Sequence, residues 1–360
     1  MRKLLIIVLF LGVFYAQADN SWSKVYEMAK KFELATMTKP DWAAQNTPPL
    51  FSAVWFTDLH ITNAKTRDIN QIAFNTARDI IKPNFALITG DNIGYSGKMT
   101  PAEKKLPKDQ RVPKSLRNQL WLKRFLEKEL ALPYHIIPGD NWPKSFEEVF
   151  GPTHYSFDFG GYHFQFHATD ITCKNTDGCC IFTPESLAWM EKDFAAASNR
   201  PCLFILHEPL WPPTFLDANK AAEILNRNPQ VIGALSGHLH LDLQFPRGHW
   251  RQIIAPSIGR SHRPGFKKML FYPDLIVLEA WEWDAEKKEF HAVPKWERLV
   301  VPEQFRPVSP STPLTVENYA SLPPAPKKED PELASRAKEI HSNLLSFMVT
   351  FGLKQFLPSP

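Results

Sequence analysis

Asp and His residues recur in five short motifs, and each motif directly follows an apolar run that is typical of a β-strand. These residue types bind metal ions and move protons, so their spacing decides what chemistry the chain can do. The motifs, in chain order, are Asp58-Leu59-His60, Gly90-Asp91-Asn92, Gly139-Asp140-Asn141, Leu206-His207-Glu208 and Gly237-His238-Leu239-His240.

The spacing within the motifs suits a metal centre. Residues two apart in extended backbone share a face, so both members of an Asp-x-His or His-x-His pair can reach one ion. Asp91 has two carboxylate oxygens and can bridge two cations, and Gly237 lets the turn before the last pair bend tightly. Two cations about 3.5–4 Å apart acidify a water and bind phosphate oxygens. We therefore expect two divalent or trivalent metal ions (Mn, Fe or Zn) on Asp58, His60, Asp91, Asp140, His207, His238 and His240.

Each motif alone has a plainer interpretation. An isolated Asp-x-His or Gly-Asp is usually a surface turn, and a single His such as His207 is more often half-buried and hydrogen-bonded. The ordered set, each member after an apolar run, is what favours a metal site.

This ordered set resembles that of the calcineurin-like metallophosphoesterase superfamily, whose order is Asp-x-His, Gly-Asp, Gly-Asn-His-Asp/Glu, a His and Gly-His-x-His. The match runs from Asp58 to His240. The resemblance implies an α/β fold, a four-layer α/β/β/α sandwich with two mixed β-sheets, and a dinuclear centre. It implies one metal on Asp58, His60, Asp91 and His240, and the other on Asp91, Asp140, His207 and His238.

The third motif departs from the family pattern. Asp140 stands where the family has Asn, and Asn141 stands where it has a His that stabilises the transition state. An amide cannot act as a general acid, and losing such an acid costs about 10²–10⁴-fold in rate. In an alternative register Asn141 is the ligand, which puts Trp142 in the His position and leaves Asp140 unexplained.

Other residues are candidates for the missing catalytic group. His154 follows the altered motif closely and is the second catalytic candidate beside Asn141, although a structural role in a loop is its alternative. Arg260, His262 and Arg263 are candidates for phosphate contact. Tyr95 lies four residues after Asp91 rather than three, and the first motif has His60 rather than Gly, so the purple acid phosphatase branch is disfavoured.

Alternating strand and helix patterns also favour an α/β sandwich. Helices are expected around Ile69–Ile81, Trp121–Leu130, Leu187–Phe194 and Ala221–Leu225, and a hairpin with Gly160-Gly161 as its turn. Thr100 to Lys114 is expected to be an exposed insertion. Strands are expected at Phe51–Phe56, Phe85–Thr89, Tyr134–Pro138, Tyr162–Ala168, Pro201–Leu206, Val231–Ser236, Arg251–Ala255 and Leu270–Ala280.

The N-terminus predicts a secretory signal peptide over residues 1–18. Arg2 and Lys3 precede an apolar run, and Ala16-Gln17-Ala18 is a cleavage pattern, so the mature chain would be secreted or periplasmic. A membrane anchor is the alternative, but the apolar run is shorter than the roughly 20 residues of a span. No later segment is predicted to cross a membrane.

The remainder divides into a metallophosphoesterase domain over 19–300, a Pro-rich linker or surface wrap over 301–330 and a C-terminal amphipathic helix over 331–360. Cys173 and Cys180 enclose a polar loop that a disulfide would close, with Cys179 as another possible partner. Cys202 is expected in the core. A zinc site is disfavoured because no His is interleaved.

Charge gives no sign of nucleic acid binding. Without Arg2 and Lys3, 42 − 2 = 40 basic residues face 38 acidic ones. We expect an exported phosphoesterase acting on a phosphorylated small molecule or other mono- or diester. The alternative is a degenerate metal-binding member that binds a phosphorylated ligand without turnover, and oligomeric state is left open.

Overall fold

The computed structural model describes residues 39–94, 99, 101–172, 180–211, 213–215, 217–261, 263–307 and 314–323. The predicted signal peptide, the C-terminal helix, Tyr95, His262 and the cysteine loop with Cys173 and Cys179 lie outside these ranges. Among the described helices, none has the length and apolar character needed to span a membrane.

The first of two large sheets has six strands, in the order β14-β13-β12-β1-β2-β3. Strands β1, β2 and β3 run parallel, with β3 at one edge, while β12, β13 and β14 pair antiparallel, so the sheet is mixed. The bounds are β1 Phe51–Phe56, β2 Phe85–Thr89, β3 Tyr134–Ile137, β12 Gly265–Phe271, β13 Leu275–Asp284 and β14 Glu289–Val300.

A second, seven-stranded sheet has the order β10-β11-β9-β8-β5-β4-β15 and is also mixed. Strands β5, β8, β9 and β11 run parallel, and β4, β10 and β15 pair antiparallel. The bounds are β4 Tyr155–Phe159, β5 Tyr162–His167, β8 Cys202–Leu206, β9 Val231–Ser236, β10 Leu243–Arg247, β11 Trp250–Ile254 and β15 Glu317–Ser321. A small separate sheet pairs β6 Ile171–Thr172 with β7 Cys180–Ile181.

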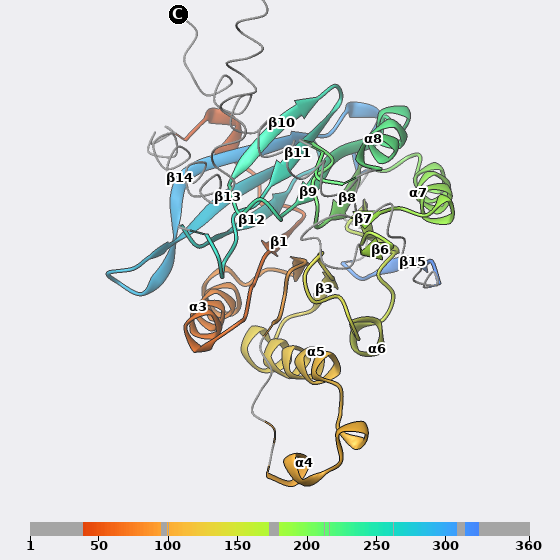
Figure 1. The fold of residues 1–360 in the computed structure, drawn as a ribbon. Helices are drawn as coiled ribbons and strands as arrows, with labels where there is room; N and C mark the ends of the chain where they lie inside the picture. Colours follow the sequence, from red (N-terminus) through yellow and green to blue (C-terminus); the bar gives the residue numbers. More distant parts are fainter. Residues whose placement is uncertain are drawn as a thin grey trace, which may run out of the picture.

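Helices flank the two sheets, with α3 and α5 on one side and α7 and α8 on the other (Figure 1). Pro184 occupies the first turn of α7, and Thr183 caps it by accepting a hydrogen bond from the Ser186 backbone N–H. The α-helices are α3 Ala64–Asn75, α4 Pro101–Lys105, α5 Lys114–Phe125, α6 Glu147–Phe150, α7 Pro184–Ala196 and α8 Ala218–Arg227. Two π-helical segments, η2 Thr76–Ile81 and η4 Leu126–Leu130, continue α3 and α5 directly. Short 3₁₀ helices are η1 Asp41–Ala43, η3 Lys108–Gln110 and η5 Glu303–Phe305.

Strand β1 shows why these elements form four layers. Its alternate residues Ala53 and Trp55 join the core between the two sheets, together with residues of β5 and β8. Val54 and Phe56 point to the other face and pack against α3 and α5. A third apolar cluster joins β8 and β9 to α7 and α8. The predicted four-layer α/β/β/α sandwich with two mixed sheets is confirmed.

Several element predictions need correction. The run Leu270–Ala280 is two antiparallel strands, β12 and β13, because Pro273 lies in a short turn between them. The polar strands β10, β14 and β15 were not predicted. Gly160 and Gly161 do form the β4–β5 turn, both with positive φ (57° and 83°), and Cys202 is buried with a free thiol, as expected.

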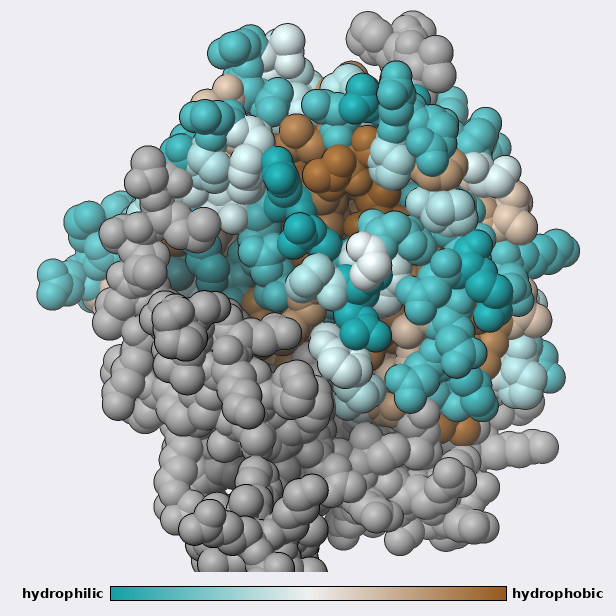
Figure 2. Space-filling view, turned by 90° about the horizontal axis from the view of Figure 1, so that it is seen from above, coloured by the Kyte–Doolittle hydropathy of each residue, from teal (hydrophilic) through white to brown (hydrophobic). Residues whose placement is uncertain are grey.

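The topology gathers the predicted motifs. Parallel strands end at the same edge of a sheet, and ligands bind there in open α/β folds. Asp58, Asp91 and Asp140 follow β1, β2 and β3 of one sheet, while His207 and His238 follow β8 and β9 of the other. Among the coloured residues in Figure 2, most are hydrophilic, and hydrophobic residues gather most clearly in the upper middle of the view.

Candidate metal centre

The backbone at the predicted ligands is unusual. Asp58, His60, Asp91, His238 and His240 all have positive φ, between 40° and 66°. Residues with a Cβ rarely adopt this left-handed conformation, and such strain is concentrated at functional sites. In each case the strand has just ended, and the positive φ turns the chain sharply so that the side chain stays at the sheet edge.

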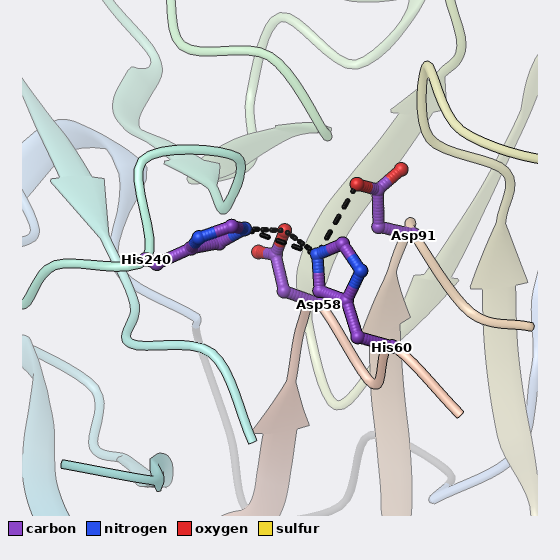
Figure 3. Close-up of side chains that lie close together, drawn as sticks. All are labelled: Asp58, His60, Asp91 and His240. Carbon is purple, nitrogen blue, oxygen red and sulfur yellow. Dashed lines mark hydrogen bonds and ion pairs between the residues drawn. The ribbon is translucent and has the colours of Figure 1, made fainter. Parts of the chain in front are cut away.

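Four of these side chains converge into a first group, formed by Asp58, His60, Asp91 and His240 (Figure 3). Nε2 of His240 lies 3.1 Å from Oδ1 of Asp58 and 3.0 Å from Nε2 of His60. Nε2 of His60 lies 3.4 Å from Oδ2 of Asp91. One ligand atom from each residue lies within 4.8 Å of all the others. This is a mixed carboxylate and imidazole set that suits Mn, Fe or Zn.

A second group contains Asp140, His207 and His238. Oδ1 of Asp140 lies 3.1 Å from Nε2 of His207 and 3.2 Å from Nδ1 of His238. Nε2 of His207 also lies 3.4 Å from Oδ1 of Asp91. Asp91 therefore turns one carboxylate oxygen to each group, which is the geometry of a bridging ligand.

Two buried atoms of the site lack hydrogen-bond partners among the described residues, namely Oδ1 of Asp58 and Nε2 of His207. Buried polar atoms are normally paired, and exceptions call for an explanation such as an ion. Both atoms point at other ligand atoms of the two groups. The donor set therefore fits a bound metal pair.

Surrounding backbone groups orient these ligands. Nδ1 of His207 lies 2.7 Å from the Thr89 carbonyl oxygen, which directs Nε2 toward the site. Thr57 Oγ1 and the His238 backbone N–H each donate a 2.9 Å hydrogen bond to Oδ2 of Asp58. Thr57 and Thr89 are not among the site residues predicted from the sequence, and their only signal there is their position immediately before a motif.

Electrostatics couple the acids and the imidazoles. Burial alone would raise the pKa of Asp58, but His207 and His240 outweigh it and hold that pKa well below its ordinary value. His238 and His207 do the same for the pKa of Asp140. Burial lowers the pKa of His207, but Asp91 and Asp58 outweigh it and raise that pKa well above 6.5. The carboxylates are thus charged and ready to bind cations.

Glycines of the motifs make room for the ligands. A Cβ at Gly90 would lie 2.5 Å from Nδ1 of His207, and a Cβ at Gly139 would collide with Oδ1 of Asp91. A Cβ at Gly237 would collide with Thr57. Gly237 does not have a positive φ, so a tight bend does not require a glycine there. The close approach of Thr57 is the reason that position 237 has no room for a side chain.

Asn141 contacts the ligands directly. Its backbone N–H donates to Oδ1 of Asp91 at 2.9 Å, and its side-chain Nδ2 donates to Oδ2 of Asp91 at 2.7 Å. Nδ2 also lies 3.2 Å from Oδ2 of Asp140. Asp140 therefore belongs to the second group, and Trp142 instead packs edge-on to His60 with ring centroids 5.5 Å apart.

The other catalytic candidates lie in different surroundings. Nε2 of His154 is 3.1 Å from Oδ1 of Asp170, its Nδ1 is 3.1 Å from Thr153 Oγ1, and it belongs to neither ligand group. Nη1 of Arg263 lies 3.6 Å from Glu282. Arg260 is exposed, and Ser257 Oγ accepts a bond from its backbone N–H while donating to the Asp58 carbonyl.

Comparisons with known proteins agree with this architecture at the level of structure. No protein-family model matches the sequence, and no curated protein does. A dimetal phosphatase from Danio rerio superposes with a TM-score of 0.55 at 13% identity, covering 71% of this chain and 100% of that one. GAP50, described as the anchor in the inner membrane complex of Plasmodium, gives a TM-score of 0.48 at 13% identity, with 72% and 92% covered.

A predicted phosphoesterase from Streptococcus pneumoniae gives a lower TM-score of 0.35 at 12% identity, covering 69% of this chain and 97% of that one. The layer order, the mixed sheets and the likeness to the dimetal phosphatase agree with one another. The chain therefore has the calcineurin-like metallophosphoesterase fold.

Proposed function

We propose that this protein is an exported, metal-dependent hydrolase of phosphate mono- or diesters. One observation carries the proposal: Asp91 directs its Oδ2 toward His60 and its Oδ1 toward His207, so one carboxylate links the two ligand groups. Two metal ions bound there would acidify a water molecule and bind phosphate oxygens, which is the chemistry of in-line displacement at phosphorus.

The protein's own residues prepare this site before a substrate arrives. Asp58 is buried and held by Thr57 and the His238 backbone, so its free oxygen Oδ1 keeps one orientation. The Thr89 carbonyl fixes His207 in the same way. Such preorganisation avoids reorientation of dipoles during reaction and is a main source of catalytic rate.

Asn141 limits the expected chemistry. Its amide donates hydrogen bonds to Asp91 and Asp140 and has no proton to give to a leaving alkoxide. We therefore expect slow hydrolysis of alkyl phosphates and faster hydrolysis of esters with acidic leaving groups, which need no proton. The substrate is some phosphoester, and its class is left to experiment.

A second candidate function rests on the same residue. A protein with intact metal ligands and no general acid can recognise a phosphorylated ligand without hydrolysing it. The two candidates differ in turnover rather than in metal content, so one assay separates them.

The test is a panel of aryl and alkyl phosphomonoesters and diesters, with Mn²⁺, Zn²⁺ or Fe²⁺ added to purified protein. Hydrolysis that disappears in Asp91→Asn and persists in Asp68→Asn, a change at an exposed carboxylate, supports the enzyme. Bound metal with no turnover on any ester would favour the binding protein.

Export is proposed from residues 1–18 alone, whose charged start, apolar run and Ala16-Gln17-Ala18 are typical of a cleaved signal peptide. N-terminal sequencing of the protein recovered from a secreting host tests this. A mature chain that begins at Asp19 agrees with export, and an intact Met1 contradicts it.

A further inference from the structure

A fully buried lysine, Lys267, contacts Asp242, which lies two residues after the proposed ligand His240. Lys267 in β12 has no exposed side-chain surface, and its Nζ lies 2.6 Å from Oδ1 of Asp242 and 2.8 Å from Oε2 of Glu297. Lys295 completes the cluster, with its Nζ 2.9 Å from Oδ2 of Asp242 and 3.2 Å from the Asp242 carbonyl oxygen. Two positive and two acidic side chains thus meet, and among them the Lys295 side chain is partly exposed.

The contacts in this cluster pair opposite charges, because Lys267 contacts both Asp242 and Glu297 and Lys295 contacts Asp242. Burial would lower the pKa of Lys267, but Asp242 and Glu297 outweigh it and raise that pKa. Burying an ion pair of this kind costs desolvation free energy, so the pair is weak evidence for a stabilising role. A role in positioning neighbouring residues explains the buried pair better.

The next residue along β12 shows the ordinary alternative. Lys268 points to the opposite face of the same strand and pairs with Glu279 at 3.0 Å, and both side chains stay partly exposed. The sheet therefore accepts a lysine pair at its surface without burying it. Burial of Lys267 is a separate feature that demands its own reason.

Asp242 ends the segment that carries two metal ligands. The segment runs from Gly237, after β9, to Asp242, before β10, and contains His238 and His240 in left-handed conformation. Its start is fixed to the site, because the Gly237 N–H donates to the His207 carbonyl. Its end is fixed by Lys267, so both ends of the strained segment are tied down.

Lys267 ties this segment to the strand that carries the first ligand. In the β1–β12 pairing, Lys267 stands opposite Trp55, three residues before Asp58. The bond from Lys267 to Asp242 therefore joins β12, which pairs with β1 in one sheet, to the segment 237–242 that follows β9 of the other sheet. His240 must meet Asp58 across that same boundary, where their ligand atoms lie 3.1 Å apart.

We propose that Lys267 is a positioning residue of the metal centre: through Asp242 it holds His240 against Asp58 and so sets the metal affinity of the Asp58–His60–Asp91–His240 group. The inference rests on the proposed metal-dependent function. Partners of this kind, which act through a ligand, typically change metal affinity by about 10–100-fold when removed.

The test measures Mn²⁺ binding rather than catalysis. The full chain is stripped with chelator and titrated with Mn²⁺, and free ion is followed by electron paramagnetic resonance, for wild type, Lys267→Met, Lys295→Met and Lys268→Met. Thermal unfolding of the metal-free proteins is recorded in parallel. Lys295→Met provides the second variant, because that side chain is partly exposed yet bonds Asp242 directly.

We expect Lys267→Met to bind one Mn²⁺ ion with about 10–100-fold lower affinity than wild type. Lys295→Met should lose less affinity, and Lys268→Met should bind Mn²⁺ like wild type. If Lys267→Met does not fold, Lys295→Met alone decides. Folded variants that bind Mn²⁺ like wild type overturn the inference and leave the proposed function standing. A wild-type chain that binds no Mn²⁺ overturns the metal centre itself.

Discussion

Nδ2 of Asn141 donates a 2.7 Å hydrogen bond to Oδ2 of Asp91, and the backbone N–H of Asn141 donates to the other oxygen at 2.9 Å. One residue thus holds both oxygens of the carboxylate that links the two ligand groups. From the sequence, Asn141 is interpreted either as the position of a missing general acid or, in an alternative register, as a metal ligand. The contacts add a second role, which is to fix the bridging ligand.

Removing the side chain of Asn141 should therefore weaken metal binding. In Asn141→Ala the backbone bond to Asp91 remains, but the bond to Oδ2 and the contact with Asp140 are lost. We expect affinity for Mn²⁺ to fall by about 10-fold or more, the usual effect of losing a group that orients a ligand. Calorimetric titration measures this, and an Asn141→Ala protein with wild-type affinity would show that the amide does not hold Asp91.

Asn141→His tests the acid position separately. A His there can donate a proton to the leaving group, which is typically worth about 10²–10⁴-fold. We expect the variant to gain on alkyl phosphates and little on aryl phosphates, so the leaving-group dependence of kcat/KM becomes shallower. Fast wild-type hydrolysis of alkyl esters with no gain in the variant would refute the missing acid. Metal content of both proteins is the control.

Gly90 should tolerate no side chain. It has φ of 100°, and a Cβ would lie 2.5 Å from Nδ1 of His207. Gly248, with φ of 70° and nothing within 4 Å of a Cβ, is the matched control in the β10–β11 turn. The left-handed backbone costs each alanine variant about 1–2 kcal/mol, so only Gly90→Ala should also lose metal. Equal metal content in Gly90→Ala and Gly248→Ala would contradict the close approach.

His163 predicts a pH-dependent contribution to stability away from the metal site. Its Nδ1 lies 2.8 Å from Asp158 and its Nε2 2.9 Å from Asp193. Burial lowers the pKa of His163, but the two carboxylates outweigh it and raise that pKa above 6.5. The pKa values of Asp158 and Asp193 are correspondingly held below 3.8 despite burial.

The sign follows from these directions. Because the pKa of His163 is raised in the folded state, its contribution to the free energy of unfolding is fully present below the unfolded pKa of 6.5 and is lost as pH rises through the folded pKa. The pKa of Asp158 is lowered, so its contribution is present above 3.8 and is lost as pH falls through its folded pKa. Urea unfolding should show His163→Gln destabilised by about 3–5 kcal/mol near pH 5.5 and by less near pH 9. The exposed His249→Gln serves as control, and a pH-independent difference for His163→Gln would count against the ion cluster.

The ligand positions could be predicted because each motif directly follows an apolar strand, and parallel strands end at a common edge. The positions of Asp58 and His207 at the sheet edge could therefore be predicted from the local sequence alone, without knowledge of tertiary contacts. The strand β14 was missed because Glu289–Val300 mixes charges with Pro294 and lacks a clean alternation. Its partner β13 supplies most of its order through pairing, which the local sequence does not reveal.

Lys267 shows the limit of sequence reasoning most clearly. Lysine is almost never fully buried, and its partners Asp242 and Glu297 are distant in the chain, so no local pattern marks it. The same holds for the Thr89 carbonyl that orients His207, since every residue has a carbonyl. Such contacts follow from the packing of the two sheets, and only the folded structure reveals them.

The most direct test of the account is the metal content of the purified chain after loading and desalting, measured by elemental analysis beside phosphoester turnover. The account predicts two equivalents of metal per chain and turnover in the wild type, with both falling sharply in Asp91→Asn, because that carboxylate serves both groups. A wild-type chain that retains no metal, or an Asp91→Asn chain that retains both equivalents and full turnover, would contradict it.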